Sequence, residues 1–530
     1  MLERGAPPAV QPLAVEVGRA FEAAGTDFTA TQQAATALTR IGADRWHAAG
    51  FTGHRVRVAV IDAGFQGYLE ARGVTIPSSV VARSLRADGD VQAGTDHGLR
   101  AAEVVARVAP RAQLYLLNFS TIPELAAAVE FAIEQRVEII SFSLGFVHNG
   151  PGDGSGPVND VVSRATTAGI AWVTASGNWA QQHWSGFFRD TNGDSIHEFT
   201  MNARDNGHHF STGDLIIVSL RWDDVWGASC SDYDLELYGP DGALVRASRE
   251  LQACSGVPVE SLQVLATKTG RYAVRIVQAG PGPAKPLDLM VLGSPDRGSP
   301  LDFFTPAGSL AQPADHPRAI SVGALVGEGP REAVFSSRGP TVNRRDKPNV
   351  LAPSGVTATA GGFAGTSAAA PHVAGALALL KQAFPDLDAE ALRARMVERA
   401  VPAEPVSDGT TSARVLQLGS LAGIGPLLPA GADEAFLVGQ IPAAGGFALV
   451  SYQGPGGYPL RFAHLLLGGR DAVSAFRFDP TVQRFRVFVA GAPAWVSDLT
   501  RLRNGDIVIL GLAPPPEQGV GALAPGDGSR

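Results

Sequence analysis

Apolar residues fall into short, nearly continuous runs over the first third of the chain. Such runs are typical of strands that are buried on both faces. They occupy residues 56–61, 113–118, 137–141 and 171–175. The segments between them have the length and spacing of crossover helices, and they occupy residues 99–108, 122–135 and 159–168. This alternation predicts an α/β domain around a parallel sheet.

The pattern changes after residue 178 to short alternating strands and tight turns. Antiparallel strands are expected at residues 215–222, 234–238, 243–248 and 272–278. Gly-Pro-Asp-Gly at 239–242 predicts a hairpin between two of them. The α/β pattern then resumes, with strands expected at 319–325 and 348–352 and helices at 367–384 and 389–400. The sequence therefore predicts one α/β domain over residues 42–188 and 296–420, interrupted by an antiparallel β-sandwich over residues 189–295.

Two further segments flank this domain. Residues 1–41 are expected to form a helical lead segment. A stretch rich in glycine and proline, residues 419–432, precedes alternating runs at 474–478 and 484–489, which predict a small β domain over residues 433–515. The periodicity predicts the strands of that domain and does not indicate its function.

Composition narrows the class of protein. At 530 residues, with 45% apolar and 18% charged residues, the chain is a folded protein of about three domains. Its net charge of −8 and the lack of a basic cluster argue against a nucleic-acid partner. Every long uncharged stretch is interrupted by Gly, Pro, Ser, Thr or His, so no membrane span is predicted, and the first residues show no signal peptide. Cys230 and Cys254 lie in the β-rich insertion, where a disulfide and two buried thiols are both open.

Three polar residues stand at the ends of apolar elements, where an open α/β sheet presents its ligand crevice. Asp62 follows the strand at 56–61, while His97 and Ser367 each stand at the start of an expected helix. Singly, these could be a turn former, a structural histidine and a helix cap. Together they supply a hydroxyl, a base and a carboxylate that orients the base. A helix start also offers backbone N–H groups to developing negative charge.

The residues around these positions form longer motifs, which are GTSAAAPHVAG at 365–375, VAVIDAGF around Asp62, DHG at 96–98 and ASGN at 175–178. Together these motifs resemble those of the subtilisin-like serine proteases, or subtilases. The chain order Asp, His, Ser is also the subtilisin order. The resemblance covers residues 42–180 and 300–420, about half of the chain.

The resemblance implies a serine endopeptidase that works through an acyl-enzyme. Ser367 would be the nucleophile, His97 the general acid and base, Asp62 its orienting carboxylate and Asn178 an oxyanion donor. The substrate cleft would be lined by Ser143, Leu144, Gly145, Ser176 and Gly177. The chemistry needs no cofactor, the partner would be a protein or peptide substrate, and the location would be extracellular or at the cell surface. The oligomeric state is left open.

The sequence also departs from the family pattern. Leu99 and Arg100 follow the DHG motif where the family commonly has threonine, which affects the packing expected around His97. The sandwich accounts for the long interval between His97 and Ser367, and it is expected to stand near the cleft. The forty or so residues before the α/β domain are too few for the family's usual inhibitory pro-domain.

A calcium site is a further candidate. Asp190, Asn192, Asp194 and Glu198 place oxygen ligands at alternate positions with a later carboxylate, as calcium-binding turns do. A plain Asn-Gly turn explains the same residues, because the full EF-hand spacing is absent. His372 is expected to pack or hydrogen-bond within its helix, and no zinc site is predicted.

Two alternatives to an active endopeptidase remain. A catalytically weak or inactive subtilase scaffold could act through its β domains as a surface- or polymer-binding protein. The related carboxyl-type serine peptidases use Glu and Asp in place of the histidine and the oxyanion asparagine, so His97 and Asn178 argue against that class.

Overall fold

The computed structural model describes residues 37–419, except 281, 294–299, 328, 359–360 and 405–413. Outside that range it describes strand β1 (Ala14–Val15) and eight strands between Leu437 and Leu512. Most of the lead segment expected at residues 1–41 therefore lies outside the described residues. The chain divides into two compact units, one of residues 1–45 and 52–419 and the other of residues 46–51 and 420–530.

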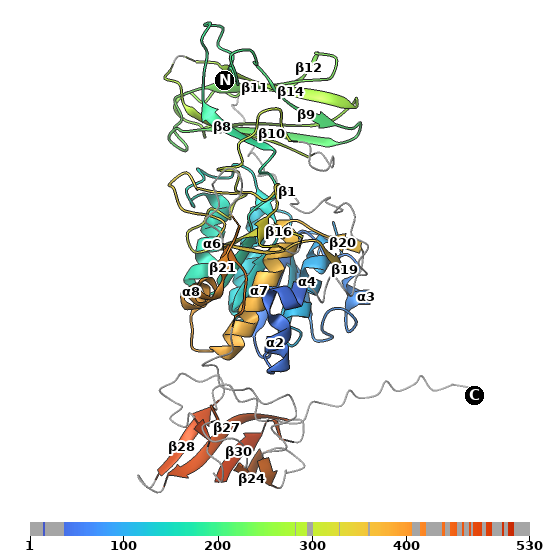
Figure 1. Ribbon diagram of the computed structural model, residues 1–530, viewed down its shortest axis with the longest axis vertical. Helices are drawn as coiled ribbons and strands as arrows, with labels where there is room; N and C mark the ends of the chain where they lie inside the picture. Colours follow the sequence, from blue (N-terminus) through green and yellow to red (C-terminus); the bar gives the residue numbers. More distant parts are fainter. Residues whose placement is uncertain are drawn as a thin grey trace, which may run out of the picture. The chain divides into compact units, whose positions relative to one another are not determined.

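The first unit is built on a ten-stranded sheet, of which eight neighbouring strands run parallel (Figure 1). In sheet order they are β22 (Arg414–Val415), β18 (Val350–Pro353), β16 (Ile320–Val326), β7 (Ala171–Ala175), β5 (Ile139–Phe142), β2 (Arg57–Asp62), β4 (Gln113–Asn118) and β3 (Val81–Ser84). The antiparallel strands β21 (Val401–Pro402) and β17 (Arg331–Glu332) complete the sheet. The apolar runs thus form the central strands, because only strands covered on both faces can be apolar throughout.

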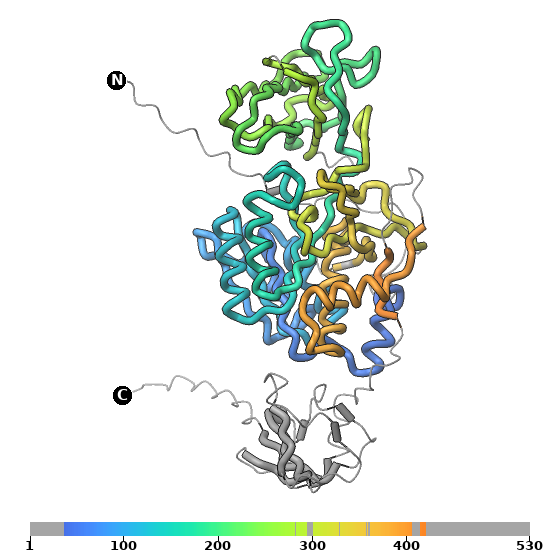
Figure 2. Tube along the Cα trace, turned by 90° about the vertical axis from the view of Figure 1, so that its left-hand side faces the viewer, coloured from blue at the N-terminus to red at the C-terminus, as the bar shows by residue number. Residues whose placement is uncertain are grey.

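Helices cover both faces of this sheet (Figure 2). On one face, α5 (Ile122–Glu134) and α6 (Pro157–Thr167) pack on a cluster that includes Ile61, Phe142 and Trp172. On the other, α4 (His97–Val108) packs against α7 (Thr366–Ala383). Helix α8 (Ala389–Arg399) follows, and the short elements are α2 (Ala43–Ala48), α3 (Tyr68–Ala71) and the hairpin of β19 (Val356–Ala358) and β20 (Gly361–Phe363).

Helix α7 is buried along nearly its whole length, and Lys381 is its one partly exposed residue. Small residues make this possible, since a central helix must approach its neighbours on every side. Gly375 shows how close the approach is, because an added Cβ there would lie 2.5 Å from the Val108 Cβ of α4.

The insertion forms two packed antiparallel sheets, as predicted (Figure 1). One contains β13 (Val259–Leu265), β10 (Leu215–Trp222), β15 (Pro286–Leu292) and β8 (His183–Phe187). The other contains β12 (Leu244–Ser248), β11 (Tyr233–Tyr238), β14 (Gly270–Gln278) and β9 (Asn206–Phe210). Because β8 pairs with β15, the sandwich begins earlier than the expected boundary at residue 189. Its outgoing and returning segments lie side by side, since Leu301 N donates to Gln181 O at 2.9 Å (Figure 2).

A disulfide joins Cys230 to Cys254 within the sandwich, which decides between the two alternatives that the sequence left open. The predicted hairpin at 239–242 joins β11 to β12, and Gly239 N donates to Ala243 O at 2.8 Å. Along β11, Tyr233, Leu235 and Leu237 face the sandwich core while the residues between them are partly exposed. This alternation is the reason that periodicity could identify the strand.

The second unit is antiparallel in all its described strand pairs. Its main sheet contains β23 (Leu437–Gly439), β24 (Gly446–Tyr452), β30 (Ile507–Leu512), β27 (Arg470–Asp479), β26 (Leu466–Leu467) and β28 (Arg484–Val489). Strands β25 (Tyr458–Pro459) and β29 (Arg501–Leu502) form a separate pair. Across the described part of both units, none of the helices has the length and apolar character of a bilayer-crossing segment.

Candidate active site

The candidate residues lie at one edge of the parallel sheet. Asp62 ends β2, Ser143 follows β5 directly, and Ser176 follows β7 directly. These three strands are neighbours in the order β7, β5, β2, and all run parallel. Their carboxyl ends therefore meet at the same edge, where α/β sheets bind their ligands.

His97 and Asp62 form a buried pair. His97 Nδ1 lies 2.9 Å from both carboxylate oxygens of Asp62, and the side chains are 4% and 0% exposed. An imidazole that donates through Nδ1 has Nε2 as the nitrogen able to accept a proton. The pairing therefore fixes the tautomer that a general base requires.

Gly98 makes this pairing possible. An added Cβ at Gly98 would lie 2.7 Å from the Asp62 Cβ and 2.6 Å from Gly64 O. The amide of Gly98 donates to Gly64 O at 3.1 Å, which holds the first turn of α4 against the end of β2. The glycine of the DHG motif thus serves close backbone approach.

Ser367 is the second residue of α7 and is fully buried. Its hydroxyl donates to Ser143 O at 3.2 Å, and the Ser143 hydroxyl donates to Ser367 O at 3.0 Å. Gly365 precedes the helix with a φ of +85°, and its amide donates to Ser354 Oγ at 2.8 Å. These contacts tie the start of α7 to the ends of the strands.

Asn178 lies beside the start of α7. Its Oδ1 accepts hydrogen bonds from Thr366 N at 3.0 Å and from Thr366 Oγ1 at 3.1 Å. An added Cβ at Gly365 would come within 2.7 Å of Asn178 Nδ2. Because Thr366 fixes Oδ1, the side-chain amide is oriented, and Gly365 keeps the space next to it open.

The residues expected to line the substrate cleft form a buried edge. Ser143 and Leu144 lead into β6 (Gly145–Phe146), which pairs antiparallel with β1. Ser176 N donates to Val322 O, and the amide of Gly177 donates to Thr366 Oγ1 at 3.3 Å. The structure therefore brings both expected segments to the edge that holds Ser367 and Asn178.

Three further residues support the site, and the sequence did not indicate their contacts. Thr366, which holds Asn178, is adjacent to Ser367 in the motif, so its position was the available signal. Phe363 lies edge-on to the His97 ring with centroids 5.4 Å apart, a contact that depends on tertiary folding alone. Arg100, at a position that departs from the family pattern, pairs with Asp96 and donates to Gly362 O at 2.9 Å. Arg100 therefore links α4 to strand β20.

The four calcium candidates are engaged in hydrogen bonds and ion pairs within and around their turn. Asp190 accepts backbone N–H groups of its own turn, including Ser195 N at 2.8 Å. Asp194 pairs with Arg204, and Glu198 accepts the Thr191 hydroxyl at 2.8 Å. Asn192 donates to Asp194. The described residues contain no group of three or more His, Cys, Asp or Glu arranged to hold a metal ion. Calcium binding at this turn stays an untested prediction.

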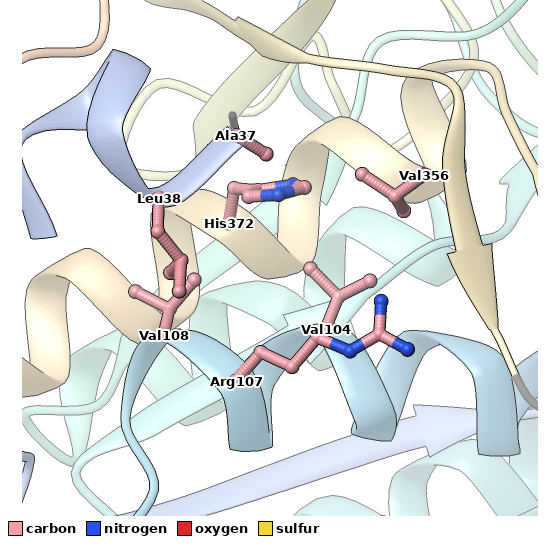
Figure 3. A pocket seen from close by; sticks show the side chains of 7 residues that line it. All are labelled: Ala37, Leu38, Val104, Arg107, Val108, Val356 and His372. Atoms are coloured by element: carbon pink, nitrogen blue, oxygen red, sulfur yellow. The ribbon is translucent and has the colours of Figure 1, made fainter. Parts of the chain in front are cut away.

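His372, the one histidine of α7, lines a small cavity of about 10 Å³ (Figure 3). Val104, Arg107 and Val108 of α4 line the same cavity, and His372 Nδ1 donates to Ala368 O at 2.8 Å. Burial lowers the pKa of His372 to about 4. It is therefore a neutral structural histidine near neutral pH.

Comparison with known proteins places the chain in a family. The model of the subtilase family, Peptidase_S8, matches residues 53–198 and 302–425, which is about half of the chain, and the gap coincides with most of the sandwich. The chain belongs to the subtilase family.

Individual relatives are distant. The minor extracellular protease Vpr of Bacillus subtilis is 25% identical over 422 residues, which are 70% of this chain and 51% of Vpr. Subtilisin E of the same species is 30% identical over 161 residues, which are 27% of this chain and 39% of that protein. The chain thus spans about half or less of the length of these curated relatives.

The fold has a solved counterpart. The structure of the Clostridium perfringens CspB protease superposes with a TM-score of 0.52 at 17% identity, covering 72% of this chain and 96% of that one. The fold is therefore subtilisin-like, as predicted, with an antiparallel sandwich inserted into the α/β layers.

Proposed function

We propose that this chain is a serine endopeptidase that uses Ser367 as its nucleophile. The observation that carries the proposal is the buried pairing of His97 Nδ1 with both oxygens of Asp62 at 2.9 Å. A buried carboxylate at this nitrogen orients the imidazole and stabilises the imidazolium that forms during acyl transfer.

The reaction follows from these groups. His97 Nε2 takes the proton of the Ser367 hydroxyl as that oxygen attacks the scissile carbonyl. The hydroxyl must first exchange its present acceptor, Ser143 O, for His97 Nε2. His97 then gives the proton to the leaving amine, and water cleaves the acyl-enzyme by the same steps.

Negative charge develops on the carbonyl oxygen in the transition state. The Asn178 side-chain amide and the Ser367 backbone N–H are the proposed donors to it. Support comes from the hydrogen bonds of Thr366 to Asn178 Oδ1, since a donor fixed in advance needs no reorganisation during the reaction.

The proposed substrate is an extended polypeptide. A peptide can add as a strand to a sheet edge, and Gly145 and Phe146 pair in this way with the antiparallel strand β1, whose place a bound peptide would take. Proteolysis outside the cell is proposed from the same family relation, because Vpr is named an extracellular protease.

Labelling with a fluorophosphonate probe tests the nucleophile. The wild-type chain should gain one adduct, Ser367→Ala none, and His97→Ala should react about 10²–10⁴-fold more slowly because it lacks the general base. Intact-mass measurement over time gives both the stoichiometry and the rate.

A second serine–histidine pair provides the control. Ser163 Oγ, on helix α6, lies 2.9 Å from His316 Nε2, in the segment before β16, and neither residue follows the carboxyl end of β2, β5 or β7. Ser163→Ala and His316→Gln should therefore label at the wild-type rate. A folded wild-type chain that forms no adduct would contradict the proposal and favour the non-catalytic binding scaffold.

A further inference from the structure

A cluster of polar side chains lies where the sandwich meets the α/β layers. Four members come from the sandwich sheet that contains β8, β10 and β15, and one comes from the segment after β6. They are His183, Ser219, Arg221, Asp288 and His148. We call this set the Asp288 cluster.

The two central strands of this sheet, β10 and β15, are largely buried on both faces, and the two faces differ. Along β10, Val218 and Leu220 belong to the sandwich core, whereas Ser219 and Arg221 contact residues of the α/β layers. Side chains alternate between the faces of a strand, so the polar residues share the outer face. Asp288 lies on the corresponding face of β15, opposite Arg221 in register.

His148 has a hydrogen-bond partner at each ring nitrogen. Its Nδ1 lies 2.8 Å from Ser219 Oγ, and its Nε2 lies 3.3 Å from Asp288 Oδ1. A neutral ring satisfies both contacts, because Nε2–H donates to the carboxylate while Nδ1 accepts from the hydroxyl. Burial lowers the pKa of His148, which agrees with the neutral form.

The backbone at His148 is also held. Its φ of +43° is a conformation that residues other than glycine adopt only when their surroundings impose it. Arg221 fixes the next turn, since it pairs with Asp288 and donates from Nη1 to Gly150 O at 3.0 Å. The sandwich thus holds residues 148–150 through both charges of one ion pair.

Apolar contacts extend this hold toward the candidate active site. Val147 packs on a cluster that joins both parts of the unit, and its members are Trp179 and Ala311 from the α/β layers and Ile217, Met290 and Leu292 from the sandwich. Trp179 directly follows Asn178, and Ala311 N donates to Ser176 O at 2.8 Å. One surface of the sandwich therefore supports the residues next to both sides of the proposed cleft.

We propose that Asp288, together with Ser219 and Arg221, positions the peptide-binding edge Gly145–Phe146 through His148. This proposal rests on the proposed peptidase function. Under it, the Asp288 cluster determines how well the peptidase binds extended substrates. A peptide that pairs along the edge depends on the register of Gly145 and Phe146, whereas a single-residue ester bypasses it. The sandwich thereby favours long, extended polypeptides over short substrates.

Two measurements on full-length Asp288→Asn test this proposal. The KM for an extended peptide should rise roughly tenfold while kcat and the fluorophosphonate labelling rate stay within about twofold of wild type, since misplacement affects binding and not the nucleophile. Hydrogen–deuterium exchange should accelerate roughly tenfold at residues 145–150 and remain unchanged in the central strands. A single-residue ester should be hydrolysed at the wild-type rate.

Companion variants separate positioning from general damage. Ser219→Ala removes only the hydroxyl contact to His148 and should give a smaller shift in the same direction, while Asp288→Glu should restore part of the KM. The control is Glu236→Gln, which breaks the Arg249 pair on the other sandwich sheet and should leave the KM and the exchange at 145–150 unchanged.

The outcomes distinguish the two proposals. Unchanged exchange at residues 145–150 in folded Asp288→Asn would overturn the positioning role, whether or not the chain cleaves peptides. Equal losses on the ester and the extended peptide would also overturn it. A wild-type chain without any fluorophosphonate adduct would contradict the peptidase function alone, and the exchange measurement would still decide the role of Asp288.

Discussion

The candidate active site in the α/β layers and the Asp288 cluster in the inserted sandwich place their buried polar side chains differently. In the α/β layers, Asp62 and Ser143 lie where strands end, and His97 and Ser367 lie where helices begin. In the sandwich, Asp288 and its partners lie within strands, on the outer face of one sheet. The first arrangement gathers groups at the edge of the sheet where α/β folds bind their ligands, and the second contacts another part of the protein.

This difference has a physical origin. Strand ends leave backbone and side chains free to face a ligand, so a buried polar group there can be retained for chemistry. A polar group within a strand must find its partners among neighbouring strands or across the interface, because an unpartnered one is costly. The α/β layers should therefore respond to substitution mainly in turnover, and the sandwich mainly in stability.

One amide from each region tests this contrast, and it carries the largest expected effect. Asn178→Ala should lower kcat about 10²–10³-fold, the range known for the same type of oxyanion donor in subtilisin itself. The KM should change little, because the donor acts on charge that develops only in the transition state. Steady-state kinetics on one peptide substrate measures both parameters.

Asn206→Ala is the matched variant in the sandwich. Its Nδ2 donates to Phe303 O at 2.7 Å, and its Oδ1 accepts from Phe303 N at 3.1 Å. Removing the buried amide should lower the free energy of unfolding by about 1–3 kcal/mol and leave kcat unchanged. A large loss of kcat in Asn206→Ala, or none in Asn178→Ala, would contradict the expected difference between the two regions.

The same contrast explains how far the sequence could predict the structure. Continuous apolar runs and helical spacing located the parallel strands and the helices, because those patterns are local. The motifs around Asp62, His97, Ser367 and Asn178 identified the candidate site, because each motif keeps its glycines where backbone must approach closely, as Gly98 does beside Asp62.

Interfaces could not be predicted in this way. Strand β8 was missed because its five residues, His183–Phe187, lack an apolar alternation and become a strand only by pairing with β15. His148 gave no signal either, since its partners Ser219 and Asp288 lie 71 and 140 residues away. Contacts of that separation depend on the folded arrangement of two regions, which no local pattern encodes.

The disulfide provides a second test of the expected stability effect in the sandwich. Replacing Cys230 and Cys254 together by serine should lower the free energy of unfolding by about 3.5 kcal/mol, the chain-entropy value for closing a loop of this size. The bond spans 24 residues within the sandwich. Urea unfolding with and without the double substitution measures this loss.

The activity of the double variant is the informative control. At temperatures well below its unfolding midpoint, the fluorophosphonate labelling rate of Ser367 should stay within about twofold of wild type, because the disulfide lies outside the Asp288 cluster. Labelling that fails while the chain remains folded would mean that the loop of Cys230 and Cys254 itself supports the site.

Buried histidines should give the smallest of these effects, a loss of stability at low pH. Both regions should show it. Burial lowers the pKa of His197 in the sandwich and of His372 in α7 to about 4, against an ordinary value of 6.5. His197 Nδ1 accepts from Arg189 N at 3.0 Å, a contact that requires the neutral ring at that nitrogen. As the pH falls below 6.5, the unfolded chain therefore binds protons that the folded chain does not.

The sign of the effect follows directly. The stability that each neutral histidine contributes is present above pH 6.5 and is lost as the pH falls toward about 4. At about pH 5.5 the loss should be about 1.4 kcal/mol for each histidine. Unfolding free energies of wild type, His197→Gln and His372→Gln at about pH 7.5 and about pH 5.5 measure it, and each variant should lose about 1.4 kcal/mol less than wild type. If only one of the two substitutions reduced this pH-dependent loss of unfolding free energy, burial would lower the pKa of the two histidines to different extents. The two regions would then differ in how tightly they exclude water, and not merely in where they place polar groups.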